Sequence, residues 1–437
     1  MTSDEQLQQY LLPNYGRYDL WPVRGEGAQV WDRDGKRYLD FAGGVSVCPL
    51  GHCHPAVVEA ITQQAKKLMH VSNWYCIDKQ AELAQVLSDD VAGIRGKSFF
   101  CNSGAEANEG LLKLARRYGV QARGIARPKI IAFSHSFHGR TMGAMFATAQ
   151  EKIWGGFGFT PEELGYLHLP FNDIEALTQA MASHPDVVAV LVEPIQGESG
   201  VNAVTPEFLR AAQRLCRAHH ALLLLDEVQC SFGRAGEMAG WKAIVPGDEI
   251  LPDGISWAKA IGSGFPLGAF WVRDVEISNP AGPTRLCDLL GPGSHGTTYG
   301  GSPLACAVGL ATIRTILAQN LCDHARRIGR HIADEVRGWN HALIKEVRQF
   351  GLFIGYEFDV DAIAPLAGGK APSIFLARKL LDAGLMTVPA GPGVVRWLPP
   401  LNITDKDVAE ALQILHLVLD GLAQQSAPAS GGSSSPT

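Results

Sequence analysis

Residues 221–227 read ALLLLDE, and this stretch is the strongest indicator of the fold. Its apolar run has the length of a strand and no polar face, which is typical of a parallel strand buried on both sides. Two further runs share this property, KIIAF (129–133) and VVAVLVEP (187–194). Helical segments separate the runs, for example TPEFLRAAQRLCRAHH (205–220). Strands that alternate with helices in this way predict a large, doubly wound, mostly parallel α/β sheet.

The two ends of the chain indicate a second, smaller α+β domain. AQVWDRDGKRYLDF (28–41) is predicted to form a hairpin, because two β-rich runs flank the turn Asp34-Gly35. After about residue 300, helices at 303–320 and 324–339 are expected to lead to shorter strands. The expected strand regions are 347–358 and 394–402, and a last helix covers 405–424.

From these patterns we expect a large domain over residues 51–309. The small domain is expected to combine residues 1–50, including the hairpin, with residues 310–424. The final residues, 425–437, are rich in Ser, Gly, Pro and Ala and are expected to be disordered.

Composition excludes several classes of protein. A net charge of −6 over 437 residues is mild and interspersed, which argues against nucleic acid or an anionic membrane as the main partner. No apolar run reaches about 18 residues, so no membrane-spanning helix is expected. The N-terminus is polar and acidic, unlike a secretory signal, and the nine cysteines never form a CxxC pair. We therefore expect a cytoplasmic protein without disulfides.

One cluster, VCPLGHCHPAVVEA, invites a metal interpretation because it contains Cys48, His52, Cys53 and His54. The spacing is not that of a structural zinc site, and the prolines and glycine mark a turn that leads into a helix. We expect no metal site.

Lys259 and Asp226 carry the strongest chemical signal. Lys259 lies in SWAKAIGSGFPLG (256–268), where apolar and small neighbours predict a buried lysine with a lowered pKa. Asp226 follows directly after the four leucines. A pyridoxal phosphate (PLP) enzyme needs both groups: the lysine forms a Schiff base, and the carboxylate keeps the pyridine nitrogen protonated. Taken alone, Lys259 could also be a surface lysine in a glycine-rich loop.

Further candidate residues follow the predicted strands, and ligands of open α/β sheets bind at the carboxyl ends of strands. Ser103 and Gly104 open a helix, whose free N–H groups suit a phosphate. Phe137 in SHSFHGRT could stack on a flat cofactor, and Arg140 could bind a carboxylate with both guanidinium nitrogens. A capped helix and a polar loop are the structural alternatives.

Two more loops fit the same edge of the sheet. EPIQGE supplies Glu193 and Glu198, which could perform acid–base work or pair with an arginine, or could simply be solvated. SHGTTYGG (294–301) supplies two hydroxyls in a glycine-rich loop of the kind that wraps a phosphate. The NAD-type and P-loop glycine motifs are missing, so those cofactors lack support.

Nine segments in order carry a resemblance to a known family. They are VRGEGAQVWDRDGKRYLDFAGGV, LGHCHPAVVEA, FCNSGAEANE, IIAFSHSFHGRT, VEPIQGESGV, LLLLDEVQCSFGR, AKAIGSGFPLGA, GSHGTTYGGSPLACAV and GPGVVRWLPPL. From about residue 13 to 420, the chain resembles the class III (subgroup II) aminotransferases of PLP fold type I. Within that family it is most similar to the acetylornithine aminotransferases, with the ornithine aminotransferases next.

The resemblance implies a role for each cofactor-binding residue. Lys259 would carry the Schiff base and then act as the base for the proton shift, while Asp226 would pair with the pyridinium nitrogen. Ring contacts would come from Phe137 on one face and Val228 on the other, with Gln229 near the phenolic oxygen. The phosphate would be held by Ser103, Gly104 and Ala105, and by Thr298 of a neighbouring subunit, which implies a homodimer.

The resemblance also implies a substrate site. Arg140 would bind the substrate α-carboxylate, with Thr297 beside it, and Tyr15 would contact the substrate. Arg396 and Glu198 would form a pair for basic or acylated amines, and Arg396 released from the pair would bind the second carboxylate of glutamate or 2-oxoglutarate.

The implied reaction belongs to arginine biosynthesis. It moves the δ-amino group of N-acetylornithine to 2-oxoglutarate, giving N-acetylglutamate 5-semialdehyde and glutamate. Ornithine, succinylornithine, 4-aminobutyrate or an acylated diamino acid remain as alternative donors. A racemase or aminomutase remains as an alternative reaction, because the cofactor alone does not choose among them. Three positions depart from the family pattern: Ser263 replaces a usual glycine, Ser302 a usual asparagine, and Trp257 a usual small residue.

Overall fold

The computed structural model describes residues 2–280 and 282–426. Its largest sheet has seven strands in the order β4-β12-β11-β10-β7-β5-β6. Their bounds are β4 (Gly96–Cys101), β5 (Lys129–Phe133), β6 (Tyr166–Leu169), β7 (Val187–Val192), β10 (Leu222–Asp226), β11 (Gly254–Trp257) and β12 (Gly268–Arg273). Only β12 runs antiparallel to its neighbours; the other pairs are parallel. The predicted α/β fold with a mostly parallel sheet is confirmed.

The leucines of β10 show why this strand lies at the centre of the sheet. Leu222 and Leu224 face a core shared with α5 (Gly104–Gln121), and Leu223 and Leu225 face a core shared with α9 (Pro206–Ala218). Each buried leucine contributes roughly 1.5–3 kcal/mol relative to exposure. Both faces of the strand are therefore apolar, as the sequence predicted.

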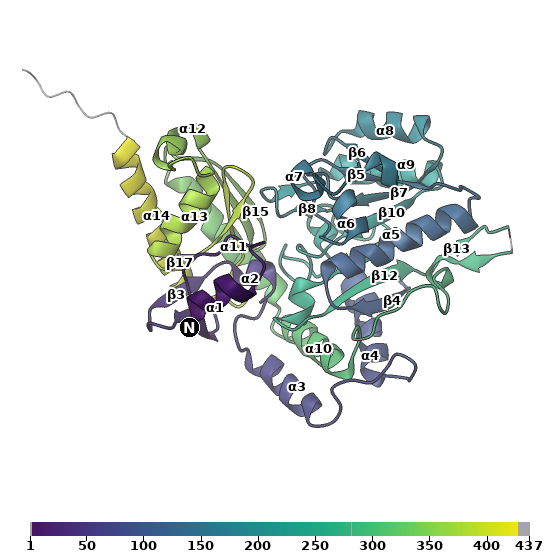
Figure 1. Cartoon of the computed structure of the whole chain (residues 1–437), viewed down its shortest axis with the longest axis horizontal. Coiled ribbons are helices and arrows are strands. Elements are labelled where there is room, and N and C mark those ends of the chain that lie inside the picture. Colours follow the sequence, from purple (N-terminus) through teal and green to yellow (C-terminus); the bar gives the residue numbers. More distant parts are fainter. Residues whose placement is uncertain (1, 281, 427–437) are drawn as a thin grey trace, which may run out of the picture.

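Helices cover both faces of the large sheet (Figure 1). Residues of α6 (Met142–Ala147) join the α5 core, and residues of α8 (Ile174–Ser183) join the α9 core. The remaining helices on this side of the molecule are α3 (Pro55–Ala65), α4 (Asp78–Val86), α7 (Glu151–Trp154) and α10 (Pro303–Ala318). Two short pairs complete it, β8 (Ile195–Gln196) with β9 (Asn202–Ala203), and β13 (Glu276–Ile277) with β14 (Thr284–Arg285).

A second, smaller assembly is built from the C-terminal part of the chain. Its sheet has the order β15-β16-β19-β18. The strands are β15 (Ile344–Phe350), β16 (Phe353–Phe358), β18 (Val388–Ala390) and β19 (Val394–Trp397). The expected strand region 347–358 is a hairpin, because Gly351 adopts a left-handed conformation between β15 and β16. The helices beside it are α11 (Leu321–Gly338), α12 (Val360–Ile363), α13 (Pro372–Asp382) and α14 (Asp405–Ser426).

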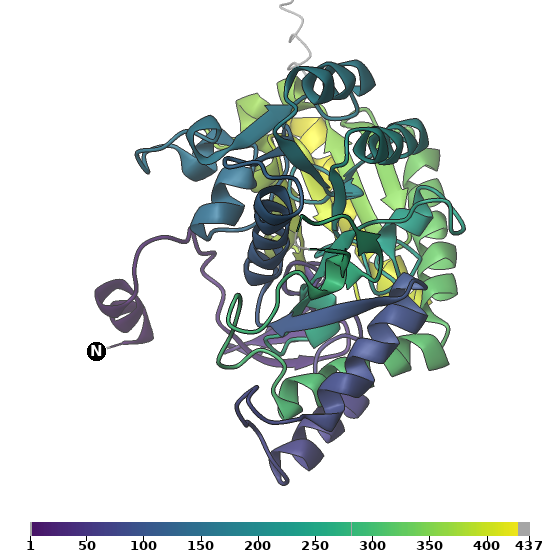
Figure 2. The same cartoon turned by 90° about the vertical axis from the view of Figure 1, so that its right-hand side faces the viewer.

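The N-terminal hairpin packs with this second assembly. The elements β1 (Pro22–Glu26), β2 (Gln29–Asp32) and β3 (Arg37–Asp40) form a sheet that β17 (Leu385–Met386) completes by pairing with β3. Figure 2 shows helix α1 (Ser3–Tyr10) lying away from the body, and none of its residues is buried. Helix α14 includes Gln425 and Ser426, the first two residues of the expected tail; residues 427–437 lie outside the described residues.

Among residues 2–280 and 282–426, no single helix is long and apolar enough to cross a membrane. The pair α10 and α11, bent by 65°, passes the test of length and composition only when the two helices are taken together.

Candidate active site

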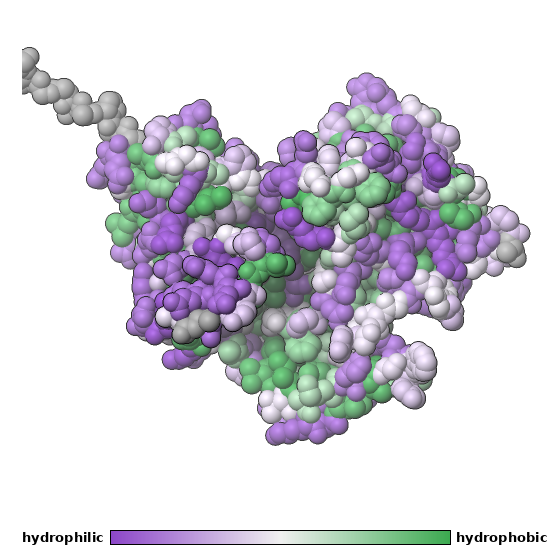
Figure 3. All heavy atoms as spheres, viewed as in Figure 1, coloured by the Kyte–Doolittle hydropathy of each residue, from purple (hydrophilic) through white to green (hydrophobic). Residues whose placement is uncertain are grey.

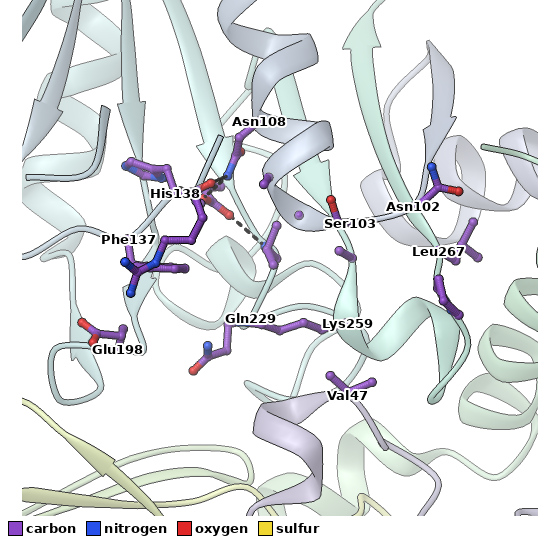
Figure 4. A pocket seen from close by; sticks show the side chains of 18 of the residues that line it. Val47, Asn102, Ser103, Asn108, Phe137, His138, Glu198, Gln229, Lys259 and Leu267 are labelled. Carbon is purple, nitrogen blue, oxygen red and sulfur yellow. Dashed lines mark hydrogen bonds and ion pairs between the residues drawn. The ribbon is translucent and has the colours of Figure 1, made fainter. Parts of the chain in front are cut away.

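A cavity of about 460 Å³ opens at the carboxyl ends of β5, β7 and β10. Figure 3 shows the molecule hollowed between its two parts, and Figure 4 shows the cavity from close by. Eleven residues that the sequence analysis singled out line it: Ser103, Gly104, Ala105, Phe137, Arg140, Glu193, Glu198, Asp226, Val228, Gln229 and Lys259. Within the described chain, no three His, Cys, Asp or Glu residues gather as a metal site.

Asp226 is the most thoroughly held carboxylate of the cavity. It ends β10 and is only 4% exposed. Its Oδ2 accepts from Asn108 Nδ2 at 2.7 Å and lies 2.7 Å from His138 Nδ1 (Figure 4). Its Oδ1 accepts from the Val228 N–H at 3.1 Å and from Ser256 Oγ at 3.4 Å. These bonds fix the orientation of a carboxylate that a ring nitrogen can then meet.

Three of these partners had no role in the sequence analysis. Asn108, His138 and Ser256 are almost completely buried polar residues. Ser256 Oγ also donates to Asn108 Oδ1 at 2.6 Å, so the three side chains and Asp226 form one buried polar network. The sequence did contain an indication of the buried position of Asn108, because this polar residue interrupts the apolar stripe that Leu111, Leu112 and Ala115 form on α5. His138 and Ser256 offered no such pattern.

Lys259 begins a short 3-10 turn, η4 (Lys259–Gly262), directly after β11. Its φ of 50° is left-handed, a conformation that is uncommon outside glycine and that concentrates at functional sites. Burial lowers the pKa of Lys259 to about 8, and the Arg396 charge acts in the same direction. The negative charges of Asp226 and Glu193 act in the opposite direction. The amine is therefore far easier to deprotonate than an ordinary lysine.

This lowered pKa predicts how the cofactor-free protein captures PLP. Only the neutral amine attacks an aldehyde, so the capture rate should rise with pH and level off above a pH of about 8. An ordinary lysine would level off only above about 10. Stopped-flow absorption of apo-protein mixed with PLP at several pH values measures the midpoint. A midpoint near 10 would contradict the burial of this amine.

The start of α5 provides a cradle for an anion. Ser103 caps the helix, because its Oγ accepts from the Glu106 N–H at 3.2 Å. The N–H groups of the first turn have no partner within the helix, and the residues at this helix start line the cavity, where such groups suit a phosphate. Gly104 is required here, because a Cβ would lie 2.8 Å from Val228 Cγ1. Both sequence interpretations of Ser103, the helix cap and the anion site, agree with this geometry.

Phe137 and Arg140 also line the cavity, and they lie beside each other. The Arg140 guanidinium lies 5.6 Å from the centre of the Phe137 ring, and the Phe137 N–H donates to Glu193 Oε2 at 2.9 Å. Burial raises the pKa of Glu193 well above its usual range, and the Asp226 charge adds to the effect. Glu193 therefore favours a proton, and it anchors the loop that carries Phe137.

Arg396 and Glu198 do not pair with each other in this structure. Arg396, on β19, is buried and donates through Nη1 to Gln229 Oε1 at 2.7 Å and through Nη2 to Pro389 O at 3.3 Å. Glu198 accepts from Gln150 Nε2 at 2.8 Å and lies 3.5 Å from Lys152 Nζ. Among the residues described, Arg396 makes no ion pair within 4.0 Å.

The other predicted site residues lie outside this cavity. Thr297 is at its edge, where Asn102 Nδ2 donates to Thr297 Oγ1 at 3.4 Å. Thr298 is exposed on the same loop and Tyr15 is exposed on the N-terminal arm, so neither side chain lines the cavity of its own chain.

The three departures from the family pattern have local explanations. Ser263 adopts a left-handed φ of 45°, which explains why glycine suits this position. Ser302 caps α10 by accepting from the Ala305 N–H at 3.2 Å, as an asparagine side chain also can. Trp257 is fully buried and packs against Phe232, with ring centres 6.1 Å apart. None of the three displaces a cavity residue.

The residues present fit PLP by their own chemistry. A deprotonatable lysine, a fixed carboxylate, a stacking aromatic ring and a helix start suited to phosphate converge on one cavity. The sequence profile of the family described as Aminotransferase class-III matches residues 12–419. The chain belongs to the class-III aminotransferases. It is therefore a PLP-dependent enzyme of fold type I, with an amino donor and a keto acid as its substrates.

Individual relatives agree with this assignment. The chain is 41% identical over 414 residues to the acetylornithine aminotransferase of Caldanaerobacter subterraneus, covering 94% of this chain and 98% of the relative. It is 38% identical to the acetylornithine/succinyldiaminopimelate aminotransferase of Photorhabdus laumondii, covering 95% and 96%. The solved ornithine aminotransferase of Toxoplasma gondii superposes with a TM-score of 0.86 at 32% identity, covering 97% and 95%.

Proposed function

We propose that this aminotransferase moves the δ-amino group of N-acetylornithine to 2-oxoglutarate, giving N-acetylglutamate 5-semialdehyde and glutamate. Several relatives near 40% identity are named acetylornithine aminotransferases, which supports this donor. The structural observation that carries the proposal is Arg396, a buried cation behind Gln229 whose partners are two neutral oxygens. Such a cation can accept the second carboxylate of glutamate, which the return half of the reaction requires.

Different residues of the chain have different roles in this reaction. Bound PLP supplies an electron sink that stabilises negative charge on the substrate carbon. Lys259 Nζ would act as the base for the 1,3-proton shift, taking a proton from the substrate carbon that carries the amino group and releasing it on the far side of the nitrogen, and its low pKa suits both transfers. Asp226 holds positive charge at the ring nitrogen. Arg140 orients the substrate through its α-carboxylate, as the resemblance implies.

Glu198 and Arg396 extend the proposal to substrate selection. Arg396 and Glu198 form no ion pair with each other, because each has other partners. Arg396 donates to Gln229, and Glu198 contacts Gln150 and Lys152. We infer that this arrangement admits a dicarboxylate, and that a pairing of Glu198 with Arg396 accompanies the acylated amine. Thr297 would support the α-carboxylate, and Tyr15 would contact the substrate from the N-terminal arm.

A homodimer is part of the proposal. Thr298 is exposed and does not line the cavity of its own chain, which supports a role for it at the phosphate of a neighbouring subunit. The loop after α3 carries exposed apolar residues, Leu68, Met69 and Trp74, and Figure 3 shows apolar surface in the lower part of the molecule. Sedimentation of the purified protein as a monomer would contradict the dimer.

The remaining proposals concern organisation and location. We propose a large domain over residues 51–309 and a small domain formed by residues 1–50 with 310–424, which places β3 and β17 in the same unit. We also propose a cytoplasmic location, with no nucleic acid or membrane partner.

Single half-reactions test the donor. The holoenzyme is mixed with one amine at a time, without keto acid, and the absorption band of the bound cofactor is followed. We expect N-acetylornithine to remove the band much faster than ornithine or 4-aminobutyrate. A faster reaction with ornithine or 4-aminobutyrate would overturn the proposed donor.

An acylated diamino acid is the second candidate donor. The name of the Photorhabdus relative joins acetylornithine with succinyldiaminopimelate, which favours a site that accepts more than one acylated amine. Succinyldiaminopimelate and succinylornithine therefore belong in the same series of half-reactions. If either reacts faster than N-acetylornithine, the second candidate replaces the first.

Replacing Arg140 with alanine should weaken every substrate that carries an α-carboxylate. A charge-assisted, bidentate contact contributes on the order of 1.5–3 kcal/mol, so kcat/KM should fall by roughly 10- to 150-fold for donor and acceptor alike. Steady-state kinetics with both substrates measure this. Arg24→Ala, at an exposed arginine on β1, is the control. An unchanged KM for all α-carboxylate substrates would remove Arg140 from the site.

A further inference from the structure

The element α2 (Gly43–Ser46), at the junction of the two parts of the molecule in Figure 1, is a left-handed turn. All four residues have positive φ, with values of 53°, 61°, 61° and 67° from Gly43 to Ser46. Val45 is a β-branched residue, for which this conformation is a true outlier. Consecutive left-handed residues are unfavourable for L-amino acids, so the surroundings must impose this turn.

Contacts on the small-domain side hold the start of the turn. Asp40 Oδ1 accepts from the N–H groups of Ala42 and Gly43 at 2.8 and 2.9 Å. The Leu398 N–H donates to Phe41 O at 2.6 Å, and a Cβ at Gly43 would lie 2.7 Å from Leu398 O. The backbone of the turn therefore lies tightly against the strand end that follows Arg396.

Arg234 holds the end of the turn. Its Nε donates to Ser46 Oγ at 3.0 Å, and its Nη1 donates to Leu352 O at 2.9 Å and to Pro399 O at 2.7 Å. The side chain is 1% exposed, and among the described residues it has no carboxylate partner. Burial lowers the pKa of Arg234 to about 9. A buried cation without a counter-charge is unfavourable for stability, as is the left-handed turn. The hydrogen bond from Arg234 Nε to Ser46 Oγ links the buried cation to the left-handed turn.

Val47, the residue after the turn, connects the turn to the active site. Val47 lines the catalytic cavity, and Figure 4 shows it on the same side as Lys259. The turn also packs against the segment Lys259–Gly262. We propose that Arg234 is a positioning residue that locks the turn Gly43–Ser46, so that Val47 closes the cavity wall beside Lys259 and keeps water from its amine. The proposal rests on the membership of the class-III aminotransferases and not on the choice of amine donor.

The test follows solvent access to Lys259 in two variants. Ser46→Ala removes the acceptor of Arg234 Nε, and Val47→Ala shortens the wall itself. The ionisable groups near Lys259 remain in both variants: Arg396, Asp226, Glu193 and Cys230. The pH midpoint for capture of PLP by the apo-protein therefore reports water beside the amine. We expect each variant to raise this midpoint by about 0.5–1 pH unit, because an unscreened lysine titrates higher.

The double variant decides whether the turn acts through Val47. If it does, Ser46→Ala combined with Val47→Ala should shift the midpoint no further than Val47→Ala alone, because coupled residues are not additive. Additive shifts would overturn the proposal. KM for the amine donor should also rise by about 3- to 10-fold in each single variant, with a smaller change in kcat.

A control separates positioning from general stability. Ser88 is a buried serine that donates to Gly96 O at 3.1 Å and accepts from Trp271 Nε1 at 3.1 Å, outside the cavity. Ser88→Ala should lower the melting temperature and leave the midpoint unchanged. Should Ser46→Ala fail to fold, Val47→Ala still decides: an unchanged midpoint in that variant overturns the proposal.

Discussion

Lys259→Ala is expected to abolish turnover, with kcat reduced by at least roughly 10⁴-fold, because one side chain both binds the cofactor covalently and moves the proton. PLP should dissociate readily from the variant, and the absorption band of the covalently bound cofactor should be absent. Absorption spectra and single-turnover kinetics measure both effects. Lys345→Ala, at a half-exposed lysine on β15, should behave as the unaltered enzyme. Normal turnover of Lys259→Ala would contradict the assignment of the catalytic lysine.

The same variant should change how the stability of the apo-protein depends on pH. Lys259 has a folded-state pKa of about 8, below its ordinary 10.5, so the unfolded chain binds more protons between these values. The free energy of unfolding should therefore rise with pH from about 8 to 10.5, by about 3 kcal/mol from this residue. Lys259→Ala should lack this rise. Urea unfolding at several pH values compares the two proteins, and identical profiles would contradict the lowered pKa.

Asp226→Asn should produce the next largest loss. Removing one partner of a buried charge pair costs about 3–5 kcal/mol, so kcat/KM should fall by roughly 10²- to 5 × 10³-fold. The dissociation constant of PLP should increase as well, because the amide cannot hold positive charge at the ring nitrogen. Steady-state kinetics and PLP titration monitored by absorption measure the two effects.

A neighbouring carboxylate offers a matched control for Asp226→Asn. Glu227 is equally buried and accepts from the N–H groups of Gly240 at 2.9 Å and Trp241 at 2.6 Å, but it does not line the cavity. Burial raises the pKa of Glu227 to about 7. Glu227→Gln should lower the melting temperature and leave the PLP spectrum unchanged. Equal losses of kcat/KM in both variants would show that the role of Asp226 is only structural.

The sequence predicted the elements that local pattern determines. Continuous apolar runs gave β5, β7 and β10, and the turn Asp34-Gly35 gave the hairpin of β2 and β3. The strand order and the antiparallel insertion of β12 follow from tertiary packing, which no local pattern reports. The short strand β11 was also not predicted, since GISW gives too brief an apolar run for its period to be recognised.

The residues of the candidate site likewise fall into those that the sequence predicted and those that it did not. Residues within contiguous motifs, such as Lys259 and Arg140, were found because their local chemistry is unusual. His138 and Ser256 were not, because their importance arises only when β5, β10 and β11 bring them to Asp226. The separation of Arg396 from Glu198 likewise depends on side-chain contacts that form only in the folded protein. Arg396 contacts Gln229, and Glu198 contacts Gln150 and Lys152.

The pairing of β3 with β17 has a consequence for biosynthesis. These strands join residues near 39 to residues near 385, so the sheet that they share cannot close until most of the chain has left the ribosome. The strands of the large sheet all come earlier, between Gly96 and Arg273, and can associate first. The N-terminal hairpin therefore remains unpaired with β17 while the large sheet forms. Nascent chains stalled before residue 385 should accordingly show a protease-resistant large sheet beside a protease-sensitive first 40 residues.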